Sequence, residues 1–164
     1  GGARPMTLIE VLNTVVLDAL WSALAAAGFA ILFNVPRRAL LGCIVTGAVG
    51  HALRTLLLLY GFTIEAATLT GATVVGFMAW GFARHYQMPS LIFAVCGTIP
   101  MVPGSYAYRA MIGLIRVAGA NPIDGEAVLI DAWINFVKTG LILLAIAAGI
   151  AAPTLLFRRR KPMV

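Results

Sequence analysis

The sequence has few charged residues: aspartate, glutamate, lysine and arginine together make up 11% of its 164 positions. Soluble globular domains carry about 25%. Because 61% of the residues are hydrophobic, there is too little polar sequence to cover an apolar core in water. A soluble domain is therefore excluded, and we expect an integral membrane protein whose solvent is the lipid bilayer.

The sequence also lacks the motifs of common catalytic and cofactor sites. It contains no HExxH, no P-loop, no phosphate-binding glycine loop and no serine–histidine–aspartate arrangement. Its two cysteines, Cys43 and Cys96, have neither metal-ligand spacing nor a CxxC motif, so we expect ordinary buried thiols. An aspartyl protease built on Asp18 and Asp131 is disfavoured because no signature surrounds them. We expect no cofactor, no metal site and no enzymatic activity.

Five apolar runs are long enough to cross a bilayer as helices, which takes about 20 residues each. They cover residues 8–33, 39–60, 64–82, 91–117 and 127–157. The breaks between them are short, and each contains proline or glycine, as turns between helices do. We predict a single all-α membrane domain over residues 1–164, a bundle of about five transmembrane helices. No cleavable signal peptide is expected, since the first run is long and leads directly into further spans.

Basic residues give the chain a net charge of +6, which in a soluble protein would indicate a nucleic-acid partner. Here they gather in short breaks and at the end of the chain, as in loops that face anionic lipid, so nucleic acid is excluded. The clusters are Arg37 and Arg38; Arg84; and Arg158, Arg159, Arg160 and Lys161. With five spans these clusters share one side, which predicts an outward N-terminus and a cytoplasmic C-terminus.

The fourth apolar run is interrupted by "TIPMVPGSYAYRA", residues 98–110. Pro100 and Pro103 each lack an N–H and clash with the preceding turn, and Gly104 leaves the backbone free. The motif should end one half-helix and begin another about 15 Å into the bilayer. Such a break is tolerated only where it is buried in protein or lines a wet cavity.

Broken helices near the bilayer midplane are typical of secondary transporters. The second half-helix should begin near Gly104 or Ser105, with free N–H groups and a positive dipole end that favour an anion. Ser105 and Tyr106 add hydroxyl groups. The alternative is a proline kink without a ligand, and the ionisable residues nearby favour a site.

Apart from Glu10, Glu65 and Arg116 at the ends of runs, six ionisable side chains fall inside the apolar runs, where charge is costly and usually functional. They are Asp18, His51, Arg54, Arg109, Asp131 and Lys138. Even with His51 neutral, one positive charge is in excess, and an unpaired buried cation is expensive. Because arginine binds carboxylates through two parallel hydrogen bonds, we predict a carboxylate-bearing ligand.

Alternative roles for these charges remain open. Internal salt bridges, such as Arg54 with Asp18, would serve packing alone. His51 titrates near neutrality and is either the carrier of a coupling proton or a packing histidine. Asp18 is the better candidate for a proton relay, since desolvation favours the protonated carboxyl. Six glycines favour close helix contacts, and with them a partner subunit or a higher oligomer: Gly47, Gly50, Gly71, Gly76, Gly81 and Gly149.

Four stretches of the sequence resemble the threonine/serine exporter family. They are "GFAILFNVPRRAL", "GAVGHALR", "TIPMVPGSYAYRAM" and the ending "NFVK…PTLLFRRRKP". The resemblance covers nearly the whole chain and is closest to the small, YjjB-type subunit of split members. It places Pro100, Pro103, Gly104 and Tyr106 in the broken-helix motif, and Gly50, His51 and Arg54 in a second motif. Asp18 also matches, whereas Arg109 and Lys138 lie outside the pattern.

This resemblance implies a multi-pass protein of the bacterial inner membrane that works with a larger membrane subunit. Split members are associated with export of succinate and related dicarboxylates, and fused relatives with export of threonine and serine. The positive excess favours a dicarboxylate, so we expect a subunit of a dicarboxylate exporter. Export of threonine and serine is the alternative, because Asp18 can supply the acid that a zwitterion needs. A structural membrane subunit without a substrate site is the second alternative.

Overall fold

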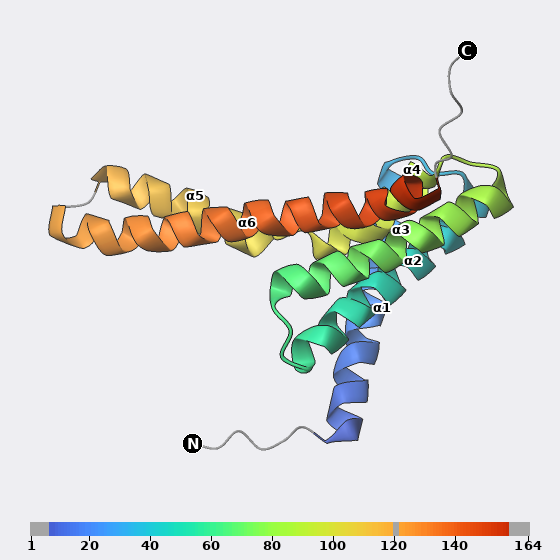
Figure 1. Ribbon diagram of the computed structural model, residues 1–164, viewed down its shortest axis with the longest axis horizontal. Coiled ribbons are helices and arrows are strands. Elements are labelled where there is room, and N and C mark those ends of the chain that lie inside the picture. The colour runs from blue at the N-terminus through green and yellow to red at the C-terminus, as the bar shows by residue number, and fades with distance from the viewer. Residues whose placement is uncertain (1–6, 120–121, 158–164) are drawn as a thin grey trace, which may run out of the picture.

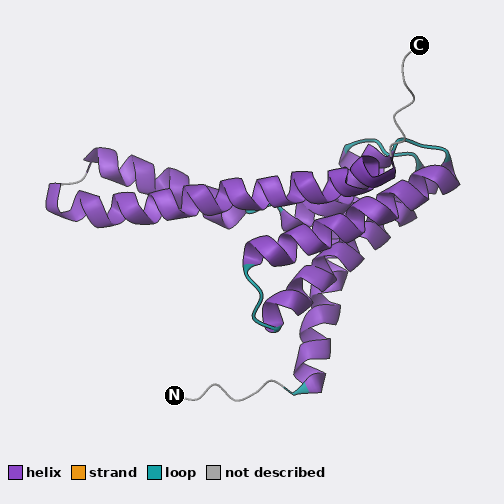
Figure 2. Ribbon diagram, viewed as in Figure 1, coloured by secondary structure: helices purple, strands orange, loops and turns teal. Residues whose placement is uncertain are grey.

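The computed structural model describes residues 7–119 and 122–157, which form helices joined by short turns (Figures 1 and 2). The helices are α1 (Leu8–Leu32), α2 (Arg37–Leu59), α3 (Ile64–Tyr86), α4 (Ser90–Thr98), the 3₁₀ helix η1 (Ile99–Met101), α5 (Gly104–Gly119) and α6 (Pro122–Phe157). No strand occurs among these residues, which confirms the all-α prediction. The basic run at residues 158–161 lies outside the described residues.

Local sequence sets the ends of several helices. Thr7 and Glu10 form a capping box at the start of α1, with hydrogen bonds of 2.7 and 3.3 Å between side chain and backbone. The Thr63 hydroxyl accepts the Ala66 N–H at the start of α3. The turn from α2 to α3 uses Gly61 at φ 86°, a conformation open to glycine. These caps satisfy backbone donors that a helix end leaves unpaired.

The helices confirm a bundle of about five membrane spans. Four of them, α1, α2, α3 and α6, are long and apolar enough to cross a bilayer. The fifth candidate is the pair of residues 90–101 and α5, which are bent by 58° across the break. The turn from α1 to α2, the turn from α3 to α4 and the end of α6 lie at one end of the molecule (Figure 1). Arg37, Arg38 and Arg84 therefore lie near the same end.

Helix α6 is longer than the predicted run, since it begins at Pro122 rather than at Ala127. Proline is favoured in the first turn of a helix, where its missing N–H costs nothing. At 1.5 Å per residue its 36 residues measure about 54 Å, against about 30 Å for the hydrocarbon core. An untilted α6 is thus much longer than one crossing requires.

Helix α5 and residues 122–139 of α6 lie side by side and project away from α1–α4 as a two-helix arm (Figure 1). Within the described residues, the extensive contacts of α5 are with α6. The bend at the break causes this arrangement, because it turns α5 away from the line of α4. At Gly113 an added Cβ would lie 2.6 Å from the Ala132 Cβ, so small residues let the two helices approach closely.

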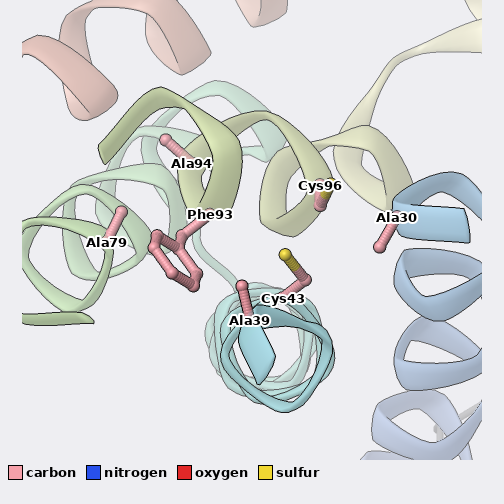
Figure 3. Packing of buried hydrophobic residues seen from close by; sticks show 7 residues of the cluster. All are labelled: Ala30, Ala39, Cys43, Ala79, Phe93, Ala94 and Cys96. Carbon is pink, nitrogen blue, oxygen red and sulfur yellow. The ribbon is translucent and has the colours of Figure 1, made fainter. Parts of the chain in front are cut away.

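The tightest apolar packing joins α2, α3 and α4 near their basic end. Phe93 of α4 is fully buried there among small residues of the neighbouring helices (Figure 3). Cys43 of α2 and Cys96 of α4 belong to the same cluster and are buried free thiols, as predicted. The Thr46 hydroxyl also bridges the two helices by donating to the Phe93 carbonyl at 3.3 Å. These contacts fix α4, and hence the break that follows it, against α2.

Backbones approach closely where two glycines meet across a helix pair. An added Cβ at Gly71 would lie 2.8 Å from the Gly50 carbonyl, and one at Gly76 would lie 2.8 Å from the Gly149 carbonyl. Real Cβ atoms do not approach backbone this closely, so the helices would have to separate. The first contact joins α2 to α3, and the second joins α3 to α6.

We expect Gly76→Ala to destabilise the fold by about 1–3 kcal/mol, because the new methyl group meets backbone that cannot move aside. Gly81→Ala on the same helix is the matched control, since its Cβ would meet nothing within 4 Å. Thermal unfolding of the two variants in detergent measures the difference. Equal midpoints would show that the α3–α6 contact is not tight.

Candidate functional site

The break in the fourth span has the predicted form. Helix α4 ends at Thr98, η1 contains Pro100, and α5 begins at Gly104. Several backbone groups of the break are paired locally, since the Val102 N–H donates to Ile99 at 3.0 Å and the Thr98 hydroxyl donates to Ala94 at 2.8 Å. Pro103 is buried, whereas Gly104 and Ser105 are exposed at the start of α5.

Arg54 of α2 reaches the break from the side. Its Nη1 donates to the Met101 carbonyl at 3.2 Å, which satisfies an acceptor that the interrupted helix leaves free. The side chain is 9% exposed, and its Nε–H has no hydrogen-bond partner among the described residues. A buried donor without a partner is costly, and a guanidinium edge is shaped for a carboxylate. Arg54 thus presents an unused donor beside the break.

Asp18 of α1 lies at the centre of a hydrogen-bonded cluster with α2. His51 Nδ1 lies 2.6 Å from Asp18 Oδ2, and the Thr55 hydroxyl donates to the same oxygen at 2.7 Å. The His51 and Asp18 side chains are 18% and 26% exposed, so the cluster is only partly closed by this chain. Because His51 and Thr55 are four residues apart, one face of α2 presents both.

The hydrogen bonds of Asp18 bear on the alternative in which Arg54 and Asp18 form a salt bridge for packing alone. The proposed packing salt bridge between Arg54 and Asp18 does not form, since the ion pair of Asp18 in the described residues is with His51. Arg54 therefore has no carboxylate in contact within the described residues, and its Nε–H is buried without a partner.

The other predicted residues divide between two places. Tyr106 of α5 packs against the buried cluster that contains Met101, and Lys138 Nζ lies 5.5 Å from the Tyr106 ring centroid, a cation–π contact. Arg109 is exposed and lies with Asp131 in a separate groove between α5 and α6. The structure thus brings Arg54 to the break, pairs Asp18 with His51 and Lys138 with Tyr106, and places Arg109 on the arm.

Two groups of the site were missed from the sequence. Thr55 is one, although its spacing from His51 could have indicated that both share a helix face. The Met101 carbonyl is the other, and no sequence pattern reveals which backbone acceptor a break leaves free. Both are hydrogen-bond partners of the predicted charged residues.

Helices α1 and α2 thus carry a buried guanidinium, a carboxylate, an imidazole and a hydroxyl group. A guanidinium is the group that pairs with a carboxylate, and a carboxylate is one that pairs with an ammonium group. No group of three or more histidine, cysteine, aspartate or glutamate side chains in the described part of the chain could hold a metal ion. The side chains described here can bind charged groups and exchange protons.

Comparison with known families gives one match that covers most of the chain. The family described as "Threonine/Serine exporter, ThrE" matches residues 18–156. The matched region includes Asp18, the His51–Thr55 face, the break and Lys138. No solved structure matches the chain.

Proposed function

The chain belongs to the threonine/serine exporter family, and from this premise we propose that it forms a substrate site for threonine and serine. The observation that carries the proposal is the buried Arg54 side chain with its unpartnered Nε–H. We propose that Arg54 binds the α-carboxylate of the substrate beside the break. This assignment uses the one strongly desolvated cation of the described residues.

The amino group of the same substrate needs an opposing charge, and Asp18 supports that role. Its Oδ2 is occupied by His51 and Thr55, and no hydrogen bond to Oδ1 occurs among the described residues. A zwitterion between Arg54 and Asp18 would neutralise both groups without leaving a charge unpaired in the membrane. Tyr106 and Lys138 lie beyond the break, and Ser105 adds a hydroxyl group to the polar side chains that begin α5.

The Asp18–His51 pair also supports a role in proton coupling. A carboxylate and an imidazole 2.6 Å apart can share or exchange one proton, and both side chains are partly exposed. We propose that protonation of this pair releases the substrate ammonium group from Asp18. Export would then be linked to a proton taken up by the pair.

We further propose a larger membrane subunit of the same family as the partner, in the bacterial inner membrane with the C-terminus in the cytoplasm. The open side of the Asp18 cluster and the projecting arm support a partner that completes the site. Arg37, Arg38 and Arg84 near one end support the orientation.

Export of succinate or a related dicarboxylate is the second candidate. The observation in its favour is the excess of cations: Arg54 and Lys138 have no carboxylate partner within the described residues, whereas Asp18 already pairs with His51. The purely structural alternative assigns Arg54 only to the Met101 carbonyl.

Efflux from loaded membrane vesicles separates these candidates. Vesicles that contain the chain alone, or the chain with a candidate larger subunit, are loaded with labelled threonine, serine or succinate. We expect efflux of threonine and serine, with the partner present. Efflux of succinate alone would contradict the amino-acid assignment, and failure of all three substrates would favour the structural alternative.

The Thr55 hydroxyl should contribute modestly to export. We expect Thr55→Val to lower the threonine efflux rate roughly fivefold, because one hydrogen bond to Asp18 is worth about 1 kcal/mol. Thr55→Ser should restore the rate. Thr70→Val is the control, since the Thr70 hydroxyl bonds only to its own helix at Ala66. An unchanged rate in Thr55→Val would remove Thr55 from the site.

A further inference from the structure

A second polar region lies on the arm, in a groove of about 410 Å³ between α5 and α6. Helix α5 contributes two arginines, Arg109 and Arg116, and α6 contributes Asp131. All three side chains are exposed. The volume falls in the range of small-molecule sites, about 300–1,000 Å³, and exceeds what one small amino acid fills.

The groove has a physical origin in the helix pairing. Arg109 and Arg116 are seven residues apart and so lie on one face of α5, two turns from each other. Gly113 lies between them and brings α5 close to Ala132 of α6. Gly113 lines the groove together with the two arginines and Asp131. The polar side chains are thus held in place by the contact that builds the arm.

The charges in the groove have opposite signs but do not neutralise each other by contact. Within the part of the chain that the structure describes, no salt bridge joins Asp131 to Arg109 or to Arg116. A molecule with both a carboxylate and an ammonium group can engage both kinds of side chain at once. A dianion would leave Asp131 opposed to like charge.

Polar side chains also connect the groove to the break. Tyr106 and Lys138 meet beside the break, and Arg109 lies one turn further along α5. Asp131 lies two turns from Lys138 along α6, about 10 Å at helical rise. Charged side chains therefore occur at intervals along the arm, from Lys138 near the break to Arg109 and Asp131 farther along α5 and α6.

We propose that the groove is a second, low-affinity site for zwitterionic amino acids, which substrate occupies after it leaves Arg54. The choice of ligand rests on the proposed function, whereas the existence of the groove does not. The affinity is low because the groove is open on one side, which suits a site on an exit route.

Protection of a thiol introduced into the groove tests this site directly. Ala127 lines the groove and is exposed, so Ala127→Cys in the full chain, held in lipid nanodiscs, is labelled with a maleimide. We expect threonine or serine to slow labelling at least fivefold. Leu114→Cys, exposed on α5 outside the groove, is the control and should label at an unchanged rate. The native thiols are buried and serve as the background.

Charge variants then identify the groups that hold the ligand. Arg109→Gln and Asp131→Asn should each abolish protection at position 127, and Arg38→Gln should not. Absence of protection, protection that persists in Arg109→Gln, or stronger protection by succinate than by threonine would overturn the proposal. Protection should survive in Arg54→Gln. The export rate of Arg54→Gln tests the proposed function separately, so the two proposals can fail independently.

Discussion

Replacing Arg54 with glutamine should lower threonine export about 100-fold or more. The variant loses a buried, charge-assisted pair of hydrogen bonds to the substrate carboxylate, worth about 3 kcal/mol or more. Glutamine is two bonds shorter than arginine, so the hydrogen bond to the Met101 carbonyl is lost as well, and export must be compared at equal amounts of folded protein. The initial rate of labelled threonine efflux measures the effect, together with the amount of folded protein in the membrane.

Arg38→Gln is the matched control for this experiment. It removes the same charge from an exposed residue of the same helix, two residues into α2. We expect export within about twofold of wild type. A normal rate in Arg54→Gln would mean that the buried guanidinium serves the break alone, as the structural alternative holds.

Replacing Asp18 with asparagine should separate exchange of substrate from its coupling to protons. Asparagine has nearly the same shape and can still accept the Thr55 hydroxyl, but it cannot take up a proton. We expect net export driven by an imposed pH gradient to fall about 100-fold. Exchange of labelled threonine for unlabelled threonine across the same vesicles should continue at a measurable rate.

Glu10→Gln supplies the control for Asp18, because it removes a carboxylate from the same helix. Glutamine at this position still serves the capping box with Thr7, so α1 should begin as before. This variant should respond to the pH gradient as wild type does. An unaltered response in Asp18→Asn would exclude Asp18 as the coupling residue.

The break could be predicted because it follows from the covalent structure of proline and glycine. Pro100 and Pro103 lack N–H groups wherever the chain folds, and Gly104 marks the start of α5 as expected. The length of the apolar runs predicted the number of spans for a similar reason, since bilayer thickness fixes helix length. The start of α6 was less predictable, because the proline at 122 can either end a turn or begin a helix.

The pairing of the charges was not predictable, because it depends on how the helices lie against one another. Sequence spacing placed His51 and Arg54 on one helix face but did not show that Asp18 contacts His51 rather than Arg54. Arg109 was grouped with Arg54 because both lie within apolar runs. The 58° bend turns α5 away, so Arg109 faces a groove on the arm instead.

The central claim is that Arg54 recognises the carboxylate of the substrate. Its most direct test is equilibrium binding of threonine and of its decarboxylated analogue, isopropanolamine, to membranes that contain the exporter. Wild type should bind threonine about 100-fold more tightly than the analogue, and Arg54→Gln should bind the two with nearly equal, weak affinity. If Arg54→Gln still prefers threonine as strongly as wild type does, Arg54 does not hold the carboxylate.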